Sequence, residues 1–424
     1  MITRTIDIAK GVRANYIHTD KFKTNYVSFN FITQADKERS YLNAMIPVIL
    51  MRGCKKYPSQ SDLNRRLQFL YSADIDARNN LVGEYQVFGF SSNMLNDRFT
   101  ADVKTTNEMA ELLCDIIFDP YLEKGVFSEK YTESEKLNLI DTIEAEINNK
   151  TRYAMNRCIE EMCKDEIYSV RKYGTVDDVK TVNAANLYEA YIKALKEYRV
   201  EIYVVGDCDF DSVVGIFKTS FNNIERNVVE PKPYPIVMKA DSVKQIEEVQ
   251  DINQGKLCIG MRTGKTIEDG NYHIAQLFSE IYGASPTSKL FVNVREKMSL
   301  CYFCRSQISQ RNGLLMVASG IEFKNKQIAE DAILNQLEAI KNGEITEEEL
   351  ENAKRSLRNA YMSIYDSGYS MELWTLNRSL SNNTDTPADE KSKVENATIE
   401  EIVEYAKGIT VDTVYFLKGE ESNG

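Results

Sequence analysis

Two stretches of this chain share one order of predicted structural elements, and a proline-rich segment near the middle separates them. Each begins with an extended run of alternating residues, TNYVSFNFIT at 24–33 and GKLCIGMRTG at 255–264. A largely apolar helix is predicted next, at Tyr41–Met51 and at Tyr272–Tyr282. Each half then passes through a turn with proline into strands that close with EYQVFGFSS or GLLMVASGI. Such a repeat predicts two related domains.

Amphipathic helices and a final strand complete each half. In the first half a long helix is predicted at Tyr131–Ile147. In the second, Thr346 and Glu349 form a capping box ahead of a helix. The inner stripe of that helix is formed by Leu350, Ala353, Leu357 and Tyr361. The last predicted strand of each half closes at a glycine, Gly206 or Gly419.

The predicted fold class is therefore α+β. We expect two homologous domains, each a mostly antiparallel sheet covered by helices, arranged as two halves of a clamshell. Three of the eight prolines, Pro231, Pro233 and Pro235, predict an extended connector. The expected boundaries are an N-terminal domain at 1–227, a linker at 228–245 and a C-terminal domain at 246–424.

Charge and hydropathy narrow the class of partner. The net charge of -12 argues against nucleic acid as the main partner, because a duplex is usually met by a basic surface. The N-terminal stretch has no apolar signal region, and no apolar window is long enough to span a membrane. We expect a cytoplasmic protein that binds neither nucleic acid nor membrane.

The eight cysteines are scattered, and most lie in apolar runs, which favours reduced, buried thiols. Cys301 and Cys304 have the spacing of a redox motif. However, they lie in LCYFCRSQ, which is typical of a strand, and no second cysteine pair completes a zinc site. A structural role is the expectation for both.

Histidine is scarce. His18 and His273 are the two in the chain, and neither has an acidic or cysteine neighbour at ligand spacing. A catalytic zinc needs about three protein ligands and a water, so this is a poor basis for a metal site. No nucleophile elbow or phosphate-binding loop is present either. The residues taken alone indicate no active site.

One segment of the second half carries a family resemblance. It runs FSEIYGASPTSKLFVNVREKMSLCYFCRSQ and combines a turn, a charge cluster and a tyrosine strand in order: Gly283, Ser285, Arg295, Glu296, Lys297, Leu300 and Tyr302. This pattern resembles the C-terminal half of the insulinase-like family of metallopeptidases, which includes pitrilysin and the mitochondrial processing peptidase. The duplicated halves and the linker fit that family over essentially the whole chain.

The resemblance implies a zinc site in the first half, and the residues for it are missing. The family carries His-x-x-Glu-His on a helix, followed by basic-Gly and Tyr-Pro-Ser segments. Anchoring on those segments places Ala44, Pro47 and Val48 where the two histidines and the glutamate would stand. We expect no catalytic residue, metal ligand or cofactor here, and a helix that kinks or begins near Pro47. The family's later glutamate falls at or near Glu144.

The resemblance also implies a role and partners. Family members often pair a zinc-bearing subunit with one that lacks the motif, and this chain looks most like bacterial members called elongation factor P aminopentanol-modification-associated proteins. In the family, an arginine and a tyrosine of the second half contact bound peptide in a chamber. These match Arg295 and Tyr302, although Ser299 replaces the usual glycine before the tyrosine strand. The structural alternative is an Arg–Glu pair beside a packed tyrosine.

The expected function is a non-catalytic, peptide-binding or scaffolding subunit paired with a zinc-bearing paralogue. Two alternatives stay open. One is an active metallopeptidase with a displaced metal site that uses Glu144, Glu146 or His18. The other is a purely structural homodimer.

Overall fold

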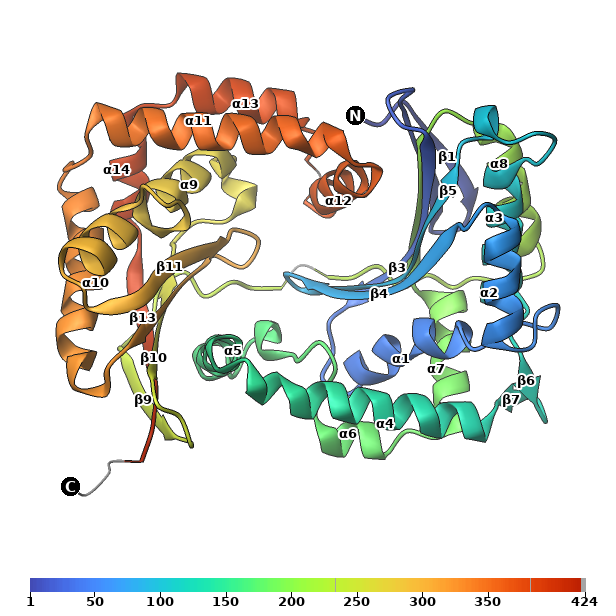
Figure 1. Cartoon of the computed structure of the whole chain (residues 1–424), viewed down its shortest axis with the longest axis horizontal. Helices are drawn as coiled ribbons and strands as arrows, with labels where there is room; N and C mark the ends of the chain where they lie inside the picture. Colours follow the sequence, from blue (N-terminus) through green and yellow to red (C-terminus); the bar gives the residue numbers. More distant parts are fainter. Residues whose placement is uncertain (233, 382, 421–424) are drawn as a thin grey trace. The chain divides into compact units, whose positions relative to one another are not determined.

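A computed structural model describes residues 1–232, 234–381 and 383–420, so Pro233 of the expected linker lies outside the described residues. The chain forms two compact units (Figure 1). Unit 1 contains residues 1–144, 170–233 and 366–377, and unit 2 contains residues 145–169, 234–365 and 378–424. Each unit therefore includes a segment from the other half of the sequence.

Unit 1 contains a six-stranded sheet in the order β1-β2-β8-β3-β5-β4. Its strands are β1 (Arg4–Ala9), β2 (Val12–His18), β3 (Thr24–Gln34), β4 (Asp74–Val82), β5 (Tyr85–Leu95) and β8 (Arg199–Gly206). Strands β2 and β8 pair in parallel, and the other neighbours are antiparallel. A separate hairpin joins β6 (Leu122–Glu123) to β7 (Val126–Phe127).

The alternation of β3 decides which face of this sheet meets the hydrophobic core. Val27, Phe29 and Phe31 are fully buried in the core that the helices complete. The residues between them are polar or carry a hydroxyl, and they point to the opposite face. The helices of this unit are α1 (Ser40–Leu50), α2 (Gln60–Phe69), α3 (Thr105–Phe118), α4 (Glu129–Ala145), α6 (Val176–Lys180), α7 (Ala184–Glu197) and α8 (Phe210–Phe221).

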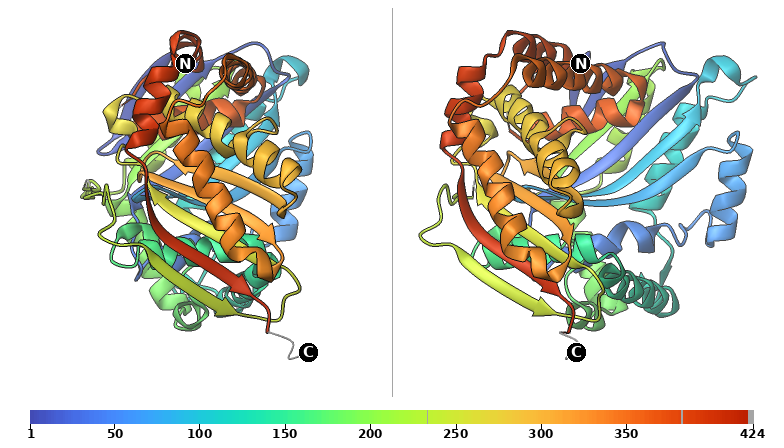
Figure 2. Two further views of the ribbon diagram at one scale, coloured as in Figure 1. Left: turned by 90° about the vertical axis from the view of Figure 1, so that its left-hand side faces the viewer. Right: turned by 60° about the vertical axis from the view of Figure 1, so that its left-hand side comes forward.

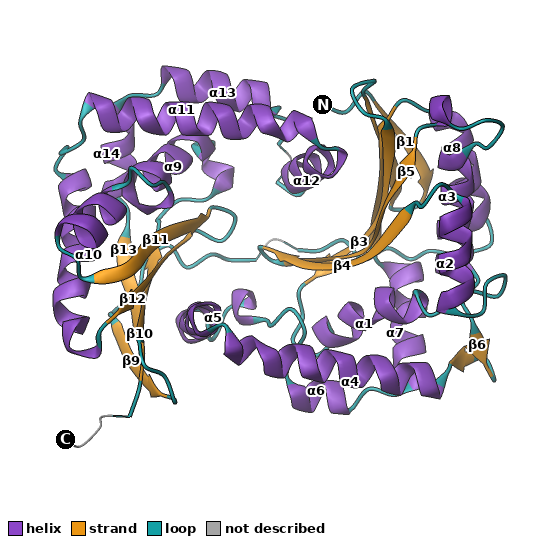
Figure 3. Cartoon of the chain, viewed as in Figure 1, coloured by secondary structure: helices purple, strands orange, loops and turns teal. Residues whose placement is uncertain are grey.

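Unit 2 contains a five-stranded sheet in the order β11-β12-β10-β13-β9. Its strands are β9 (Lys244–Val249), β10 (Gly255–Arg262), β11 (Cys301–Ser309), β12 (Leu314–Ile321) and β13 (Thr410–Lys418), with β9 and β13 parallel. Helices flank the sheet (Figure 3), and they include α9 (Tyr272–Ser279), α10 (Lys326–Lys341), α11 (Glu347–Ser363), α13 (Pro387–Asn396) and α14 (Ile399–Lys407). In the left panel of Figure 2, α10 crosses the strands of this sheet.

The two sheets have the same topology. Reading β9-β13-β10-β12-β11 against β2-β8-β3-β5-β4 matches every strand in chain order and direction, and β1 is the one addition. Helices α1 and α9 follow equivalent strands in the two halves. The predicted α+β class with two related, mostly antiparallel sheets is confirmed, with one parallel pair in each sheet. The physical reason is that both halves place the same alternating runs and apolar helices in the same order.

Each sheet also buries a helix from the other half of the sequence. In unit 2, α5 (Lys150–Met162) places Cys158 against Cys258 of β10 and belongs to a cluster that includes Met316 and Tyr415. In unit 1, α12 (Gly368–Ser379) places the fully buried Glu372 against the polar face of β3. The two compact units therefore exchange one helix each.

The capping box and buried stripe predicted for the helix after Thr346 are confirmed. Thr346 and Glu349 form a reciprocal capping box at the start of α11, and the stripe Leu350, Ala353, Leu357 and Tyr361 is buried. Residues 222–232 and 234–243 contain no helix or strand. No described helix is both long enough and apolar enough to cross a membrane.

Candidate functional site

The positions that match the zinc motif lie on α1 and carry no metal-binding chemistry. Ala44 and Pro47 are buried and Val48 is half-buried. Ala44 and Val48 are four residues apart, which places them on one face of the helix, as the two histidines would be. Neither side chain has a lone pair for zinc, and Pro47 has no group that could act as a base. These residues do not fit a catalytic metal.

The expectation at Pro47 is a kink or the start of the helix, and the start is wrong, while the kink stays a prediction. Helix α1 begins at Ser40 and continues through Pro47, whose carbonyl accepts a hydrogen bond from the Met51 amide at 3.2 Å. Proline removes one donor from the helix but leaves its carbonyl free to accept. Met45 and Ile49 are buried in the core on either side, and this packing holds the helix in place.

The residues of a displaced metal site are scattered. Glu144 is exposed near the end of α4, and Glu146 is half-buried in the short turn that follows. The Nε2 atom of His18 lies 3.5 Å from a carboxylate oxygen of Asp207. Within 1–232, 234–381 and 383–420, no group of three His, Cys, Asp or Glu side chains is placed to hold a metal ion.

Arg295 and Tyr302 are in contact. Arg295 lies in a π-helical segment, η6 (Leu290–Lys297), and Tyr302 is the second residue of β11. The Nε atom of Arg295 donates a hydrogen bond to the Tyr302 carbonyl at 3.1 Å, and its guanidinium lies 4.5 Å from the centre of the Phe291 ring. π-helical turns are rare and are often found at functional sites.

Both side chains remain available to a ligand. The Tyr302 side chain is 67% exposed. Among the described residues, Arg295 forms no ion pair, and its two terminal nitrogens have no hydrogen-bond partner. Arg305, further along β11, is likewise exposed and without a carboxylate partner in the described part of the chain. The structural alternative, an Arg–Glu pair beside a packed tyrosine, therefore does not describe this region. Arg305 was not singled out from the sequence, where only its place on the same strand could have indicated it.

The turn that precedes η6 has a steric requirement for glycine at Gly283. A Cβ atom at this position would lie 2.6 Å from the Ser306 hydroxyl and 2.8 Å from the Ser306 amide of β11. Only glycine lets the turn approach the strand this closely. Ser299 adopts a left-handed backbone with φ of 52°, so it keeps the conformation that glycine would favour at this position.

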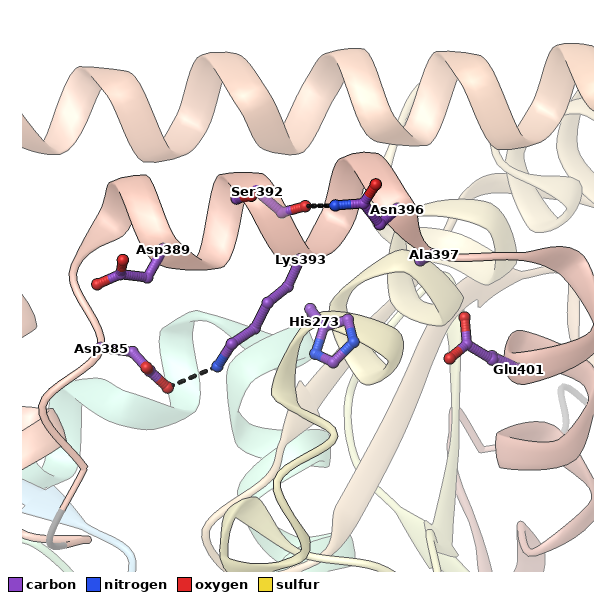
Figure 4. Close-up of a pocket in the computed structure, with 8 residues that line it drawn as sticks. All are labelled: His273, Asp385, Asp389, Ser392, Lys393, Asn396, Ala397 and Glu401. Atoms are coloured by element: carbon purple, nitrogen blue, oxygen red, sulfur yellow. Dashed lines mark hydrogen bonds and ion pairs between the residues drawn. The ribbon is translucent and has the colours of Figure 1, made fainter.

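A separate polar pocket of about 480 Å³ lies in unit 2 (Figure 4). Its lining residues come from α9, α13, α14 and the loop before α13: His273, Asp385, Asp389, Ser392, Lys393, Asn396, Ala397 and Glu401. Burial first, and then the nearby Lys393 ammonium, lowers the pKa of His273 below its usual value. Its buried Nδ1 atom has no hydrogen-bond partner within the described part of the chain.

The charged groups of this pocket are already satisfied within unit 2. Lys393 binds Asp385 at 2.7 Å and the buried Glu390 at 3.3 Å. Asp389 and Glu401 accept the backbone hydrogen bonds that cap α13 and α14. Such local pairing is sufficient to explain these residue types without a ligand.

Comparisons with known proteins agree with the geometry. Residues 181–357 match the family described as "Peptidase M16 inactive domain". The chain is also 35% identical to "Probable inactive metalloprotease YmfF" of Bacillus subtilis, over 97% of this chain and 96% of that protein. The chain belongs to the M16 peptidase family. It is an inactive homologue within that family, which is the insulinase-like family that the turn and tyrosine strand resemble.

This M16 homologue is also similar to a solved structure and to a second Bacillus subtilis protein. A crystal structure of a conserved protein from Enterococcus faecalis V583 has a TM-score of 0.91 and 30% identity, covering 99% of both chains. "Uncharacterized zinc protease YmxG" of Bacillus subtilis is 26% identical over 45% of this chain and 46% of its own length. The expectation of a peptidase-like fold without the zinc motif agrees with the name "Probable inactive metalloprotease" of the first Bacillus subtilis relative.

Proposed function

We propose that this M16 homologue is a non-catalytic subunit that binds an extended peptide at Arg295 and Tyr302. The observation that carries the proposal is the guanidinium of Arg295, which has no carboxylate partner among the described residues and is held by the Phe291 ring and the carbonyl of the exposed Tyr302. A guanidinium is a planar fork of donors that matches carboxylates and peptide carbonyls. An exposed tyrosine adds a large contact area at low entropic cost.

The peptide-binding proposal is tested by fluorescence anisotropy. The probes are a labelled, unstructured acidic peptide and the same sequence with Gln in place of Glu. Arg295→Ala and Tyr302→Ala should each weaken binding of the acidic peptide about tenfold or more, as hot-spot residues do. Tyr302→Phe should retain most of the affinity, and Arg355→Ala, on an exposed arginine of α11, should have no effect. Equal binding by the Arg295 and Arg355 variants would contradict the proposal.

We further propose that the partner is a zinc-bearing M16 paralogue, with a homodimer as the alternative. This chain retains the family fold but has Ala44, Pro47 and Val48 in place of the zinc motif, so a partner would have to supply the chemistry. Bacillus subtilis has relatives of this chain with both kinds of name, an inactive metalloprotease and a zinc protease. A cytoplasmic location and a place among the elongation factor P aminopentanol-modification-associated proteins are part of the proposal.

Pairing is tested by co-expression with a paralogue that keeps His-x-x-Glu-His, followed by size-exclusion chromatography with light scattering. A heteromeric complex supports the proposal. A self-association that excludes the paralogue, together with no peptide binding, would favour the purely structural homodimer. Metal analysis of protein purified without chelators tests the remaining alternative, because stoichiometric zinc with chelator-sensitive peptide hydrolysis would indicate an active metallopeptidase.

A further inference from the structure

A β-bulge brings two cysteines of β11 to the same face of the sheet. Cys301 lies opposite Ile321 of β12, and Cys304 lies opposite Ser319, so Tyr302 has no partner between them. Residues two apart on one strand share a face and are about 6.6 Å apart at roughly 3.3 Å per residue. The bulge therefore compresses a three-residue separation into a two-residue one.

The burial of the side chains agrees with this register. Cys301 and Cys304 are 9% and 3% exposed, whereas Tyr302 between them is 67% exposed. In a regular strand, residues three apart would point to opposite faces, about 10 Å apart along the strand. Cα atoms in a disulfide usually lie about 4.4–6.8 Å apart. The bulge thus places this pair at the upper end of the range in which a disulfide can form.

The thiol environment distinguishes Cys301 from the other cysteines. A hydrogen bond from the Cys304 thiol lowers the pKa of Cys301 to about 7 against the effect of its burial, and Ser319 and Arg295 contribute in the same direction. The same hydrogen bond, with burial, raises the pKa of Cys304. Burial is the main cause of a raised pKa at each of the other six: Cys54, Cys114, Cys158, Cys163, Cys208 and Cys258.

We propose that Cys301 and Cys304 are a reversible dithiol–disulfide pair, a site of oxidation by hydroperoxides that reshapes the bulge at Tyr302. The Cys301 thiolate attacks the O–O bond of hydrogen peroxide, and after protonation gives a sulfenic acid and one water. The Cys304 sulfur then attacks the Cys301 sulfur, the S–O bond breaks, and a second water leaves with the Cys304 proton. Two thiols and one peroxide become one disulfide and two waters, and an external dithiol reverses the change.

Oxidation has a structural consequence because Tyr302 is the residue that the bulge extrudes. Drawing Cys301 and Cys304 together shortens the span of backbone that presents the Tyr302 carbonyl to Arg295. If the proposed peptide function holds, on which this step rests, the oxidised and reduced forms differ in peptide affinity. Coupling between two such sites is commonly about fivefold or more.

The chemistry is tested on the unmodified protein. Reduced protein is treated with a small excess of hydrogen peroxide, its free thiols are alkylated after denaturation, and it is digested with trypsin. The peptide Met298–Arg305 contains both cysteines of the pair and no other. It should be lighter by two hydrogen atoms and unalkylated, and dithiothreitol should reverse this. Alkylated thiols in that peptide after oxidation, or a disulfide that joins other cysteines first, would overturn the proposal.

Variants separate the two roles. Cys304→Ser should trap the Cys301 sulfenic acid, which dimedone labels, whereas the wild type should show little of this adduct. Cys208→Ser, at a half-buried thiol with a raised pKa, is the matched control and should leave disulfide formation unchanged. Equal dimedone labelling of the wild type and Cys304→Ser would show that Cys304 does not resolve the intermediate and would refute the pair.

The structural consequence has readouts that are independent of the first assay. Hydrogen exchange of Met298–Arg305 should change between the reduced and oxidised forms, and an unchanged rate would contradict reshaping of the bulge. The acidic peptide should then bind the two forms with affinities that differ about fivefold. Peptide binding by neither form would count against the proposed function and would leave the redox pair standing. Equal binding by both forms would overturn only the coupling.

Discussion

Arg262 of β10 donates two hydrogen bonds to the carboxylate of Glu166, at 3.0 Å from Nη1 and 2.5 Å from Nη2. Both side chains are buried, and Asp412 of β13 accepts a third bond from Nε at 2.9 Å. Glu166 follows α5, so this pair fixes a segment of the first sequence half within unit 2. Unit 1 has a matching arrangement, in which Arg78 of β4 lies 3.1 Å from the buried Glu372 of α12.

Glu166→Gln should destabilise unit 2. The substitution leaves the buried Arg262 with a single carboxylate, and removal of one partner from a buried ion pair costs about 3 kcal/mol or more. Urea unfolding followed by circular dichroism measures the change in the free energy of unfolding. The control is Asp177→Asn, which breaks the exposed ion pair with Lys180 and should cost less than about 0.5 kcal/mol. Similar losses from both variants would contradict this account.

Pro47→Ala should stabilise unit 1 by about 1 kcal/mol. Alanine is roughly 3 kcal/mol more favourable than proline inside a helix, and the loss of two buried CH₂ groups offsets about 1.6 kcal/mol of that gain. Thermal unfolding of the variant and the wild type is the measurement. A lower melting temperature for the variant would show that the packing of the proline ring contributes more stability than alanine gains from its helix propensity.

Ser299→Gly should stabilise unit 2 slightly, by about 0.5 kcal/mol. The left-handed backbone at Ser299 costs a serine about 1 kcal/mol, and the greater freedom of glycine in the unfolded chain offsets part of the relief. Chemical denaturation detects a change of this size through the transition midpoint. A destabilised variant would indicate that the hydrogen bond from the Ser299 hydroxyl to the Glu296 carbonyl contributes more than the left-handed backbone costs.

Alkylation of Cys301 by iodoacetamide should follow a titration with a midpoint near pH 7. The thiolate is the reactive form, so the rate should rise between about pH 6 and pH 8 and then level off. The remaining cysteines should react slowly over this range because burial raises their pKa values. Mass spectrometry of Met298–Arg305 gives the rate, and Cys304→Ala should move the midpoint upward because it removes the hydrogen bond that lowers the pKa of Cys301.

His273 should make the protein less stable as the pH falls below about 6.5. Its folded-state pKa is lowered by burial and by Lys393, while Glu401 and Asp385 oppose this effect more weakly. The unfolded chain therefore binds the proton more readily in the window between the lowered pKa and about 6.5. Stability is fully present above that window and decreases within it. In urea titrations, the free energy of unfolding of the His273→Gln variant should fall less between pH 7.5 and pH 5.5 than that of the wild type. Identical pH profiles of the two proteins would refute the assignment to His273.

Much of the fold followed from local pattern. The alternation in β3 and β10, the capping box at Thr346 and the buried stripe of α11 all depend on residues close together in the sequence. The loss of the zinc motif was also evident at Ala44, Pro47 and Val48, because metal coordination requires particular side chains. Pro47 shows the limit of local reasoning, since core packing around it keeps the helix continuous.

The sequence by itself determined the duplicated α+β halves and the absence of catalytic zinc ligands, because periodicity and residue chemistry are local properties. Only the tertiary structure decided the exchange of α5 and α12, since Arg262 meets Glu166, and Arg78 meets Glu372, across long separations with no local signal. It also decided that Cys301 and Cys304 lie on the same face of the sheet. A regular strand would separate their side chains, and the bulge opposite β12 places them on one face.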